Sequence, residues 1–285
     1  MITAQLVGGL GNQMFQYATA RALALRRGVG LVLDTSEFSN YHLHRYGLHH
    51  LAISAEVTHK RHPASTGSRV LDRLRDLAGF GTPALYREAS LRFDPVVLSL
   101  PRGTALAGYW QCERYFIDHA DLIRSELSVK TSAEGDNLEH LGRIRSGVAV
   151  SVHIRRGDYV SNTRANSVHG TCDISYYEAA ARHIAERCDD APTFYVFSDD
   201  PDWVSQNFRI PYDMVLLRHN GADRNYEDLR LMSACRHHII ANSSFSWWGA
   251  WLNAAPGKIV VAPQRWFRAD DLDSTDLVPT DWVRI

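Results

Sequence analysis

The chain has 285 residues, of which 45% are hydrophobic and 22% are charged. This length and composition are typical of one or two soluble globular domains, so they exclude a disordered or fibrous protein. The 31 Lys and Arg residues nearly balance the 32 Asp and Glu residues and leave a net charge of −1. Since domains that bind nucleic acids usually carry a basic excess, we expect no nucleic-acid partner.

The cysteines and the hydropathy pattern indicate the compartment. The four cysteines are scattered and lack the CxxC spacing of a metal site, which favours free thiols in a reducing compartment. The sequence opens on an apolar, strand-like segment without the pattern of a signal peptide. No apolar stretch approaches the ~20 residues that a membrane span needs. We therefore expect a cytoplasmic protein with at most peripheral membrane contact.

The N-terminal segment has the pattern of a βαβ unit. A strand is expected over 2–7, a helix over 13–27 after a glycine-rich turn, and a second strand over 31–33. Such a unit implies parallel strands joined by a right-handed crossover. The pattern of strands and helices weakens between about 40 and 82. Within it, arginines and apolar residues over 69–77 indicate a short amphipathic helix lying on its own domain or, alternatively, on a membrane surface.

Strands and helices alternate more regularly in the second half, which predicts a doubly wound α/β domain. A linker-like stretch at 132–137 places the domain boundary near residue 145. We expect an N-terminal domain over 1–145 and a C-terminal domain over 146–285, with the last residues packing back on the N-terminal domain. The expected strands of the second half are 148–154, 193–197, 214–217, 238–241 and 259–261, and the expected helices are 174–187, 224–235 and 244–253.

Two adjacent arginines, Arg155 and Arg156, follow the strand expected over 148–154, and His153 precedes them. Guanidinium groups stay charged and bind phosphate oxygens through paired N–H donors. The carboxyl end of a strand in an open α/β sheet is also where ligands bind. An ion pair with Asp158 would explain one arginine, while the second needs another anion. The segment therefore predicts an anion-binding site.

A second polar cluster, Asn242–Ser244, stands between an expected strand and an expected helix. Asn and Ser at such a junction bind the free N–H groups of the first helical turn. The same groups, together with the helix dipole, bind phosphate. Capping explains one of the three residues but not all of them. The tryptophans that follow, Trp247, Trp248 and Trp251, are expected in the core.

The acidic residues allow structural explanations. Glu227 and Asp228 begin an expected helix, where the helix dipole accounts for one of them; the other is a candidate acceptor for a base or a sugar. The segments 200–202 and 271–273 have the DxD spacing of metal-binding carboxylates. Helix capping explains the first and a solvated acidic turn explains the second. We therefore expect no metal site.

Three segments read GGLGNQMFQY over 8–17, HIRRGDY over 153–159 and NSSFSWWG over 242–249. Together they closely resemble the α-1,2-fucosyltransferases of glycosyltransferase family 11. The resemblance implies a GT-B-like fold, with two Rossmann-like domains facing a cleft. It also implies transfer of L-fucose from GDP-β-L-fucose to the 2-hydroxyl of a terminal galactose, with inversion and without a metal or cofactor. The acceptor would be an oligosaccharide or a lipid-linked glycan bound on the N-terminal side, and the C-terminal domain would bind GDP-fucose.

The resemblance assigns roles to individual residues. His153 and Asp228 would contact guanine. Arg155 and Arg156 would hold the diphosphate as catalytic residues, and Asn12 would lie near the reacting centre. The other donor-binding residues would be Asn242, Ser243, Ser244 and Phe245.

The residues themselves are compatible with this chemistry. A departing nucleotide diphosphate carries negative charge, which two arginines and a helix N-terminus can stabilise without a cation. No general base stands out among Asp34, Glu37 and the histidines of the N-terminal half. Two alternatives stay open: a GDP-sugar transferase that forms another linkage, and a non-catalytic nucleotide- or glycan-binding protein of the same fold.

Overall fold

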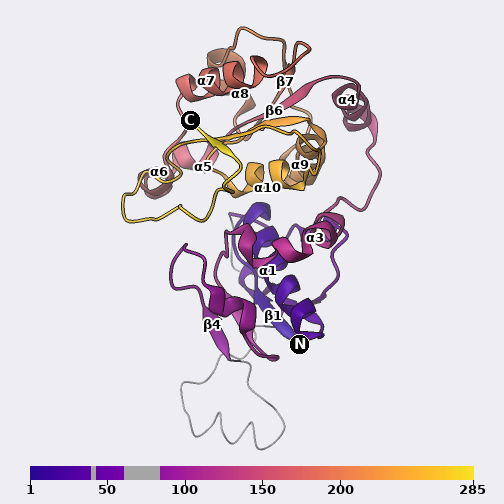
Figure 1. Ribbon diagram of the computed structural model, residues 1–285, viewed down its shortest axis with the longest axis vertical. Helices are drawn as coiled ribbons and strands as arrows, with labels where there is room; N and C mark the ends of the chain where they lie inside the picture. Colours follow the sequence, from indigo (N-terminus) through magenta and orange to yellow (C-terminus); the bar gives the residue numbers. More distant parts are fainter. Residues whose placement is uncertain (40–42, 61–83) are drawn as a thin grey trace, which may run out of the picture. The chain divides into compact units, whose positions relative to one another are not determined.

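The computed structural model describes residues 1–39, 43–60 and 84–285. The chain forms two compact units, each drawn with its own sheet in Figure 1. Residues Met1–Ser128 and Thr275–Leu277 make up the first unit, and residues Val129–Ser274 and Val278–Ile285 make up the second. Parallel strands and helices build both units, which confirms the expected α/β class. The amphipathic helix expected over 69–77 lies outside the described residues.

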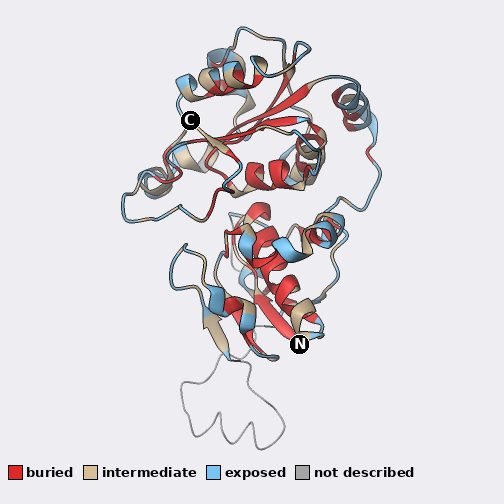
Figure 2. Cartoon of the chain, viewed as in Figure 1, coloured by how far each residue is buried: buried red, intermediate tan, exposed pale blue. Residues whose placement is uncertain are grey.

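The first unit is built on a parallel five-stranded sheet in the order β3-β2-β1-β5-β4. Helix α1 (Leu10–Arg27) connects β1 to β2 and is buried along most of its length (Figure 2). Gly28 ends this helix in a left-handed conformation that glycine adopts without strain. The described strands are β1 (Ile2–Gln5), β2 (Leu31–Asp34), β3 (Glu56–Thr58), β4 (Leu85–Arg87) and β5 (Ala105–Ala107), and α3 (Ala120–Glu126) follows them.

The second unit is built on a parallel six-stranded sheet, β8-β7-β6-β9-β10-β11, which is the strand order of a Rossmann fold. Its strands are β6 (Ala149–Ile154), β7 (Thr193–Ser198), β8 (Met214–Leu216), β9 (His237–Ile239), β10 (Val260–Ala262) and β11 (Val283–Arg284). Its helices are α4 (Gly135–Ser146), α5 (Gly157–Ser161), α6 (Thr163–His169), α7 (Ile174–Ala185), α8 (Pro201–Asn207), α9 (Asn225–Ala234) and α10 (Ser244–Leu252). Every expected strand and helix of this half is present within a few residues of its predicted bounds.

Strand β6 is buried on both faces, as a central parallel strand must be. Val150, Val152 and Ile154 pack with α7 in one apolar cluster. Because side chains alternate along a strand, the other face of the sheet carries a second cluster with residues of α4 and α9. Helix α10 is buried along most of its length (Figure 2), and its three tryptophans belong to the core, as expected.

The boundary between the units falls after Ser128 rather than near residue 145. Helix α4 belongs to the second unit because Leu141 and Ile144 join the core cluster that contains Met232. Its first turn reads Gly-Asp-Asn, which is poor in helix-forming residues and therefore resembles a linker. Near the chain end, Thr275–Leu277 belongs to the first unit, while the final residues belong to the second.

Two further observations concern the cysteines and the hydropathy of the helices. All four cysteines are free thiols. Within the described part of the chain, none of the helices combines the length and the apolarity needed to cross a membrane.

Candidate active site

The strand order of the second unit marks one position for a ligand. From β6 the chain proceeds through β7 and β8 on one side, and through β9 to β11 on the other. In open α/β sheets, ligands bind at the carboxyl ends of the strands where the order reverses, here between β6 and β9. Arg155–Gly157 follows β6 at this point, and Asn242–Ser244 follows β9. The topology therefore brings together the two polar segments that the sequence singles out.

Each of the two arginines is paired with an aspartate of the loop after β7. Arg155 Nη1 lies 2.9 Å from Asp199 Oδ2. Arg156 Nε lies 3.4 Å from Asp200 Oδ2, and its guanidinium carbon stacks 3.6 Å from the centre of the Trp203 ring. The side chains of Arg155 and Arg156 stay 22% and 19% exposed. Five N–H donors per guanidinium leave capacity for a further anion.

These pairs correct one step of the sequence argument. We expected that one arginine would pair within the protein, through Asp158, and that the other would need an external anion. The described ion pairs give both arginines an internal aspartate, and the side chain of Asp158 is not among the described ones. The case for an anion site therefore rests on position and exposure rather than on an unpaired arginine.

The residues before α10 divide into two roles. Ser243 caps the helix, since its hydroxyl accepts the N–H of Phe245 at 3.3 Å. Ser244 begins the helix and is half-buried. The Asn242 side chain instead donates to three backbone carbonyls of other loops, those of His169, Gly170 and Trp266, at 2.9, 3.3 and 3.2 Å. Asn242 therefore holds the end of α6 and the segment around Trp266 beside its own segment, and its contact with the donor stays a prediction.

His153 is the second-last residue of β6, and its ring faces Phe245 in the first turn of α10. Its ring centre lies 5.7 Å from that of Phe245, and the residue is only 5% exposed. Burial, with a smaller contribution from the Arg155 charge, lowers the pKa of His153 to about 3. The imidazole is therefore neutral at physiological pH. Its buried Nδ1 has no hydrogen-bond partner among the described residues, and buried polar atoms normally have one.

Asp228, on α9, is a half-buried carboxyl with an unusual pKa. Its Oδ1 accepts the Nδ2–H of Asn220 at 2.8 Å, and Asn220 exchanges two 2.9 Å hydrogen bonds with Asn137. Burial raises the pKa of Asp228 to about 7, although the Asn220 hydrogen bond opposes the rise. A carboxyl of this kind is a candidate functional group. The neighbouring Glu227 is buried and ion-paired with Arg230 at 2.8 Å, so it is structural.

Asn12 lies in the first unit, at the start of α1. Its Oδ1 accepts the Nε2–H of Gln111, from the segment after β5, at 2.8 Å. Gly8 has a φ of +79°, and a Cβ there would lie 2.7 Å from Asn12 Nδ2. Glycine is therefore needed at position 8 both for the backbone and for the approach of Asn12.

Two glutamines of the same segment have roles that the sequence did not reveal. Gln13 is buried and binds the carbonyls of Gly8 and Arg45, both at 2.9 Å. Gln16 accepts the N–H of Val7 and donates to the carbonyl of Gly108, both at 3.0 Å. Both fix the loops at the carboxyl edge of the sheet. The sequence signal that could have indicated these roles is the pair of glutamines, three residues apart, directly after a run of glycines.

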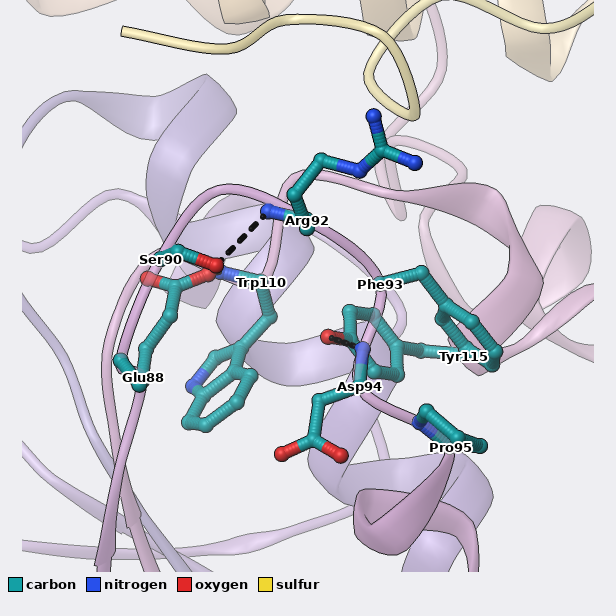
Figure 3. A pocket seen from close by; sticks show the side chains of 9 residues that line it. Glu88, Ser90, Arg92, Phe93, Asp94, Pro95, Trp110 and Tyr115 are labelled. Carbon is teal, nitrogen blue, oxygen red and sulfur yellow. Dashed lines mark hydrogen bonds between the residues drawn. The ribbon is translucent and has the colours of Figure 1, made fainter. Parts of the chain in front are cut away.

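A cavity of about 240 Å³ lies near the carboxyl end of β4, and Figure 3 shows the side chains that line it. Glu88 and Asp94 are its acidic lining residues, and Trp110 and Tyr115 are buried at its wall. Both oxygens of Glu88 accept backbone N–H groups, those of Tyr109 and Trp110. Burial raises the pKa of Glu88. The sequence did not indicate Glu88, and the observed contacts give it the role of holding the loop after β5.

Asp200 and Asp202, one of the two carboxylate pairs with metal-like spacing, have other partners. Asp200 caps α8 by accepting the N–H of Trp203 at 3.2 Å, as expected for a helix start. Asp202 forms an ion pair with Arg218. Over residues 1–39, 43–60 and 84–285, no group of three His, Cys, Asp or Glu side chains converges as a metal ion requires.

Comparison with known proteins places this geometry in context. Residues 1–285 match the family described as glycosyl transferase family 11. The chain is 37% identical over 291 residues to the alpha-1,2-colitosyltransferase of Escherichia coli, covering 100% of this chain and 99% of that protein. It is 28% identical to galactoside alpha-(1,2)-fucosyltransferase 1 of Plecturocebus brunneus, over 86% of this chain and 63% of that protein.

Similar solved structures support the fold. A variant of Arabidopsis thaliana FUT1 in complex with GDP superposes with a TM-score of 0.52, over 94% of this chain and 72% of that chain, at 10% identity. At this identity the likeness concerns the fold alone. With the two parallel sheets, it confirms an α/β fold of the GT-B-like type.

Proposed function

Because the chain belongs to glycosyl transferase family 11 and is an enzyme of the glycosyltransferase class, we propose that it transfers L-fucose from GDP-β-L-fucose to the 2-hydroxyl of a terminal galactose, with inversion. Membership in this class sets aside the non-catalytic alternative. The α-1,2 linkage is supported by the names of two relatives, a colitosyltransferase and a galactoside fucosyltransferase. The observation that carries the proposal is the pair of guanidiniums after β6, on the same sheet edge as the α10 N-terminus.

The diphosphate would bind Arg155, Arg156 and the first turn of α10. Charge-assisted hydrogen bonds from guanidiniums are stronger than neutral ones, and a helix N-terminus adds N–H donors and a favourable dipole. Negative charge grows on the diphosphate as the sugar departs, so these fixed donors stabilise the transition state more than the ground state. Ser243, Ser244 and Phe245 would contact the phosphates or the sugar from the same turn.

The guanine base would bind Asp228 and His153. An ionised carboxylate can accept the ring N–H and the exocyclic amine of guanine together, a pair that adenine and uracil do not present. Asn220 occupies Oδ1 from one side, which orients the carboxylate. His153 stays neutral, so it would serve as a hydrogen-bonding partner through Nδ1 rather than as an acid or a charge.

GDP-colitose is the second candidate donor. The relative that is 37% identical over the full chain is named a colitosyltransferase, and colitose is fucose without its 3-hydroxyl. A site that hydrogen-bonds this hydroxyl would reject the deoxy sugar strongly, whereas a purely apolar contact would discriminate only weakly. We favour fucose on the motif resemblance, with the α-1,2 linkage common to both donors.

The proposal also covers the acceptor, the cofactor requirement and the compartment of the enzyme. The acceptor would be a galactose-terminated oligosaccharide or lipid-linked glycan, with Asn12 on the acceptor side. The enzyme would need no metal or cofactor and would work in the cytoplasm, with at most peripheral membrane contact.

A comparison of the two donors tests this function. Purified enzyme is given GDP-fucose or GDP-colitose with a panel of terminal galactosides and non-galactosides, and kcat/KM is measured for each pair. The proposal predicts turnover of GDP-fucose with galactosides and a lower kcat/KM for GDP-colitose. A higher kcat/KM for GDP-colitose would assign the enzyme to that donor, and turnover of neither GDP-sugar would refute the proposal.

A further inference from the structure

Asp199 lies beside both arginines, and each of its carboxylate oxygens has a separate task. Oδ2 accepts from the Arg155 guanidinium at 2.9 Å. Oδ1 accepts the backbone N–H of Arg156 at 2.8 Å. One carboxylate therefore fixes the side chain of the first arginine and the backbone that carries the second.

Gly157 is the residue that makes this approach possible. A Cβ at position 157 would lie 2.4 Å from Asp199 Oδ2 and 3.0 Å from its Cγ. Contacts below 3.0 Å force a shift, so any side chain at 157 would displace the carboxylate. The φ of Gly157 is not positive. The absence of a side chain, rather than the conformational freedom of glycine, is therefore what this position requires.

The residues beside Asp199 continue the same pattern. Strands β6 and β7 pair in register up to Ile154 and Ser198, and the Ser198 hydroxyl donates to the Ile154 carbonyl at 2.8 Å. One residue after Asp199, the Asp200 carboxylate caps α8 and lies 3.4 Å from Arg156 Nε. The last residue of β7 and the two that follow it thus hold the last residue of β6 and the two arginines that follow it.

We propose that Asp199, seated against Gly157, is a positioning residue that presents Arg155 and Arg156 to one shared anion. This inference rests on the proposed function, in which the anion is the donor diphosphate. The negative charge of Asp199 repels a nearby anion and so weakens the attraction of the two arginines for it. The benefit of Asp199 must therefore be the geometry that it imposes on the arginines. It removes the freedom of a long side chain and of the loop before the ligand binds, which lowers the cost of ordering them.

The test separates the diphosphate from the nucleoside. Dissociation constants for GDP and for guanosine are measured for wild type, Asp199→Asn, Asp199→Ala and Gly157→Ala, with kcat and KM for the donor. GDP affinity and kcat should fall at least about tenfold in Asp199→Ala and in Gly157→Ala, because both changes displace guanidinium donors that form charge-assisted hydrogen bonds with the diphosphate. Guanosine affinity should stay within about twofold, since a general loss of structure would weaken both ligands.

The conservative and control variants sharpen the result. Asp199→Asn keeps the shape and can still accept the Arg156 N–H, so its loss should be smaller than that of Asp199→Ala. Asp202→Asn removes an exposed ion pair between α8 and Arg218. This pair does not include Arg155 or Arg156, so the GDP affinity and kcat of the variant should match those of wild type. If Asp199→Ala fails to fold, Gly157→Ala and Asp199→Asn carry the test.

Two outcomes would overturn the positioning role: unchanged or tighter GDP binding in Asp199→Ala, or equal losses for GDP and guanosine. Failure of the wild type to bind GDP at all would instead refute the proposed function. The two failures are therefore distinguishable.

Discussion

The buried Asp228 carboxyl should lower the free energy of unfolding of the unliganded protein at neutral pH. Burial raises the pKa of Asp228 from 3.8 to about 7. Because one pKa unit corresponds to about 1.36 kcal/mol, the folded state loses up to about 4 kcal/mol of stability above pH 7. The loss grows from about pH 4 to pH 7, where the unfolded chain releases a proton that the folded chain keeps. Below about pH 4 both states keep the proton, and the loss disappears.

Asp228→Asn removes this ionisation and keeps the contact, since the amide oxygen can still accept from Asn220. We expect the variant to gain about 1–4 kcal/mol in free energy of unfolding at pH 8 and almost nothing near pH 4. GDP affinity should fall at least about tenfold in the same variant, because the amide cannot accept both guanine donors. Denaturant unfolding at the two pH values and calorimetry with GDP measure both effects.

Glu227→Gln provides the matched control on the same turn of α9. This change removes a buried carboxylate that is ion-paired with Arg230, so it should destabilise the protein. An Asp228→Asn variant that is no more stable at pH 8, or equally stabilised at both pH values, would refute the assignment of a costly buried carboxyl. Unchanged GDP affinity in the folded variant would remove Asp228 from the base site.

Replacing Arg155 or Arg156 by Lys keeps the charge but removes the paired N–H donors that fit a phosphate, so kcat/KM should fall at least about tenfold. Wild-type kinetics in both Lys variants would remove the arginines from the diphosphate site. Activity should persist in excess EDTA, because Asp200 and Asp202 are already engaged by a helix start and by an ion pair. Complete loss of activity that Mn²⁺ restores would contradict metal independence. GDP binding should tighten as pH rises through about 7, since guanine binds the ionised carboxylate of Asp228, whose unliganded pKa lies there. Calorimetry should show release of a proton that the Asp228→Asn variant does not release, and equal release in both would rule out this linkage.

Regular, buried elements were predictable from the sequence, while short exposed ones were not. Strand β6 is a continuous apolar run, and its length and burial follow from its central place in a parallel sheet. Strand β3 has three residues, two of them exposed, so no alternation marks it. The expected linker, 132–137, includes the first three residues of helix α4, because this first turn lacks helix-forming residues. Its place in the core depends on packing against α9, which no local pattern contains.

The site shows the same division. Arg155, Arg156 and the Asn242–Ser244 cluster follow strands whose carboxyl ends could be inferred, so their shared location was predictable. Their partners were not, because Asp199 reaches Arg155 only through the register of β6 with β7. The role of Asn242 was likewise hidden, since the carbonyls that it binds lie 24 to 73 residues away in the chain.

The structure of the product tests the central claim most directly. The enzyme is incubated with GDP-β-L-fucose and a terminal β-galactoside, and the purified product is examined by NMR for its linkage and anomeric configuration. The account predicts an α-L-fucosyl residue on the galactose 2-hydroxyl, which is the inverted configuration. A fucosyl group on another hydroxyl, a β-linked product, or no transfer in the presence of bound GDP-fucose would contradict it.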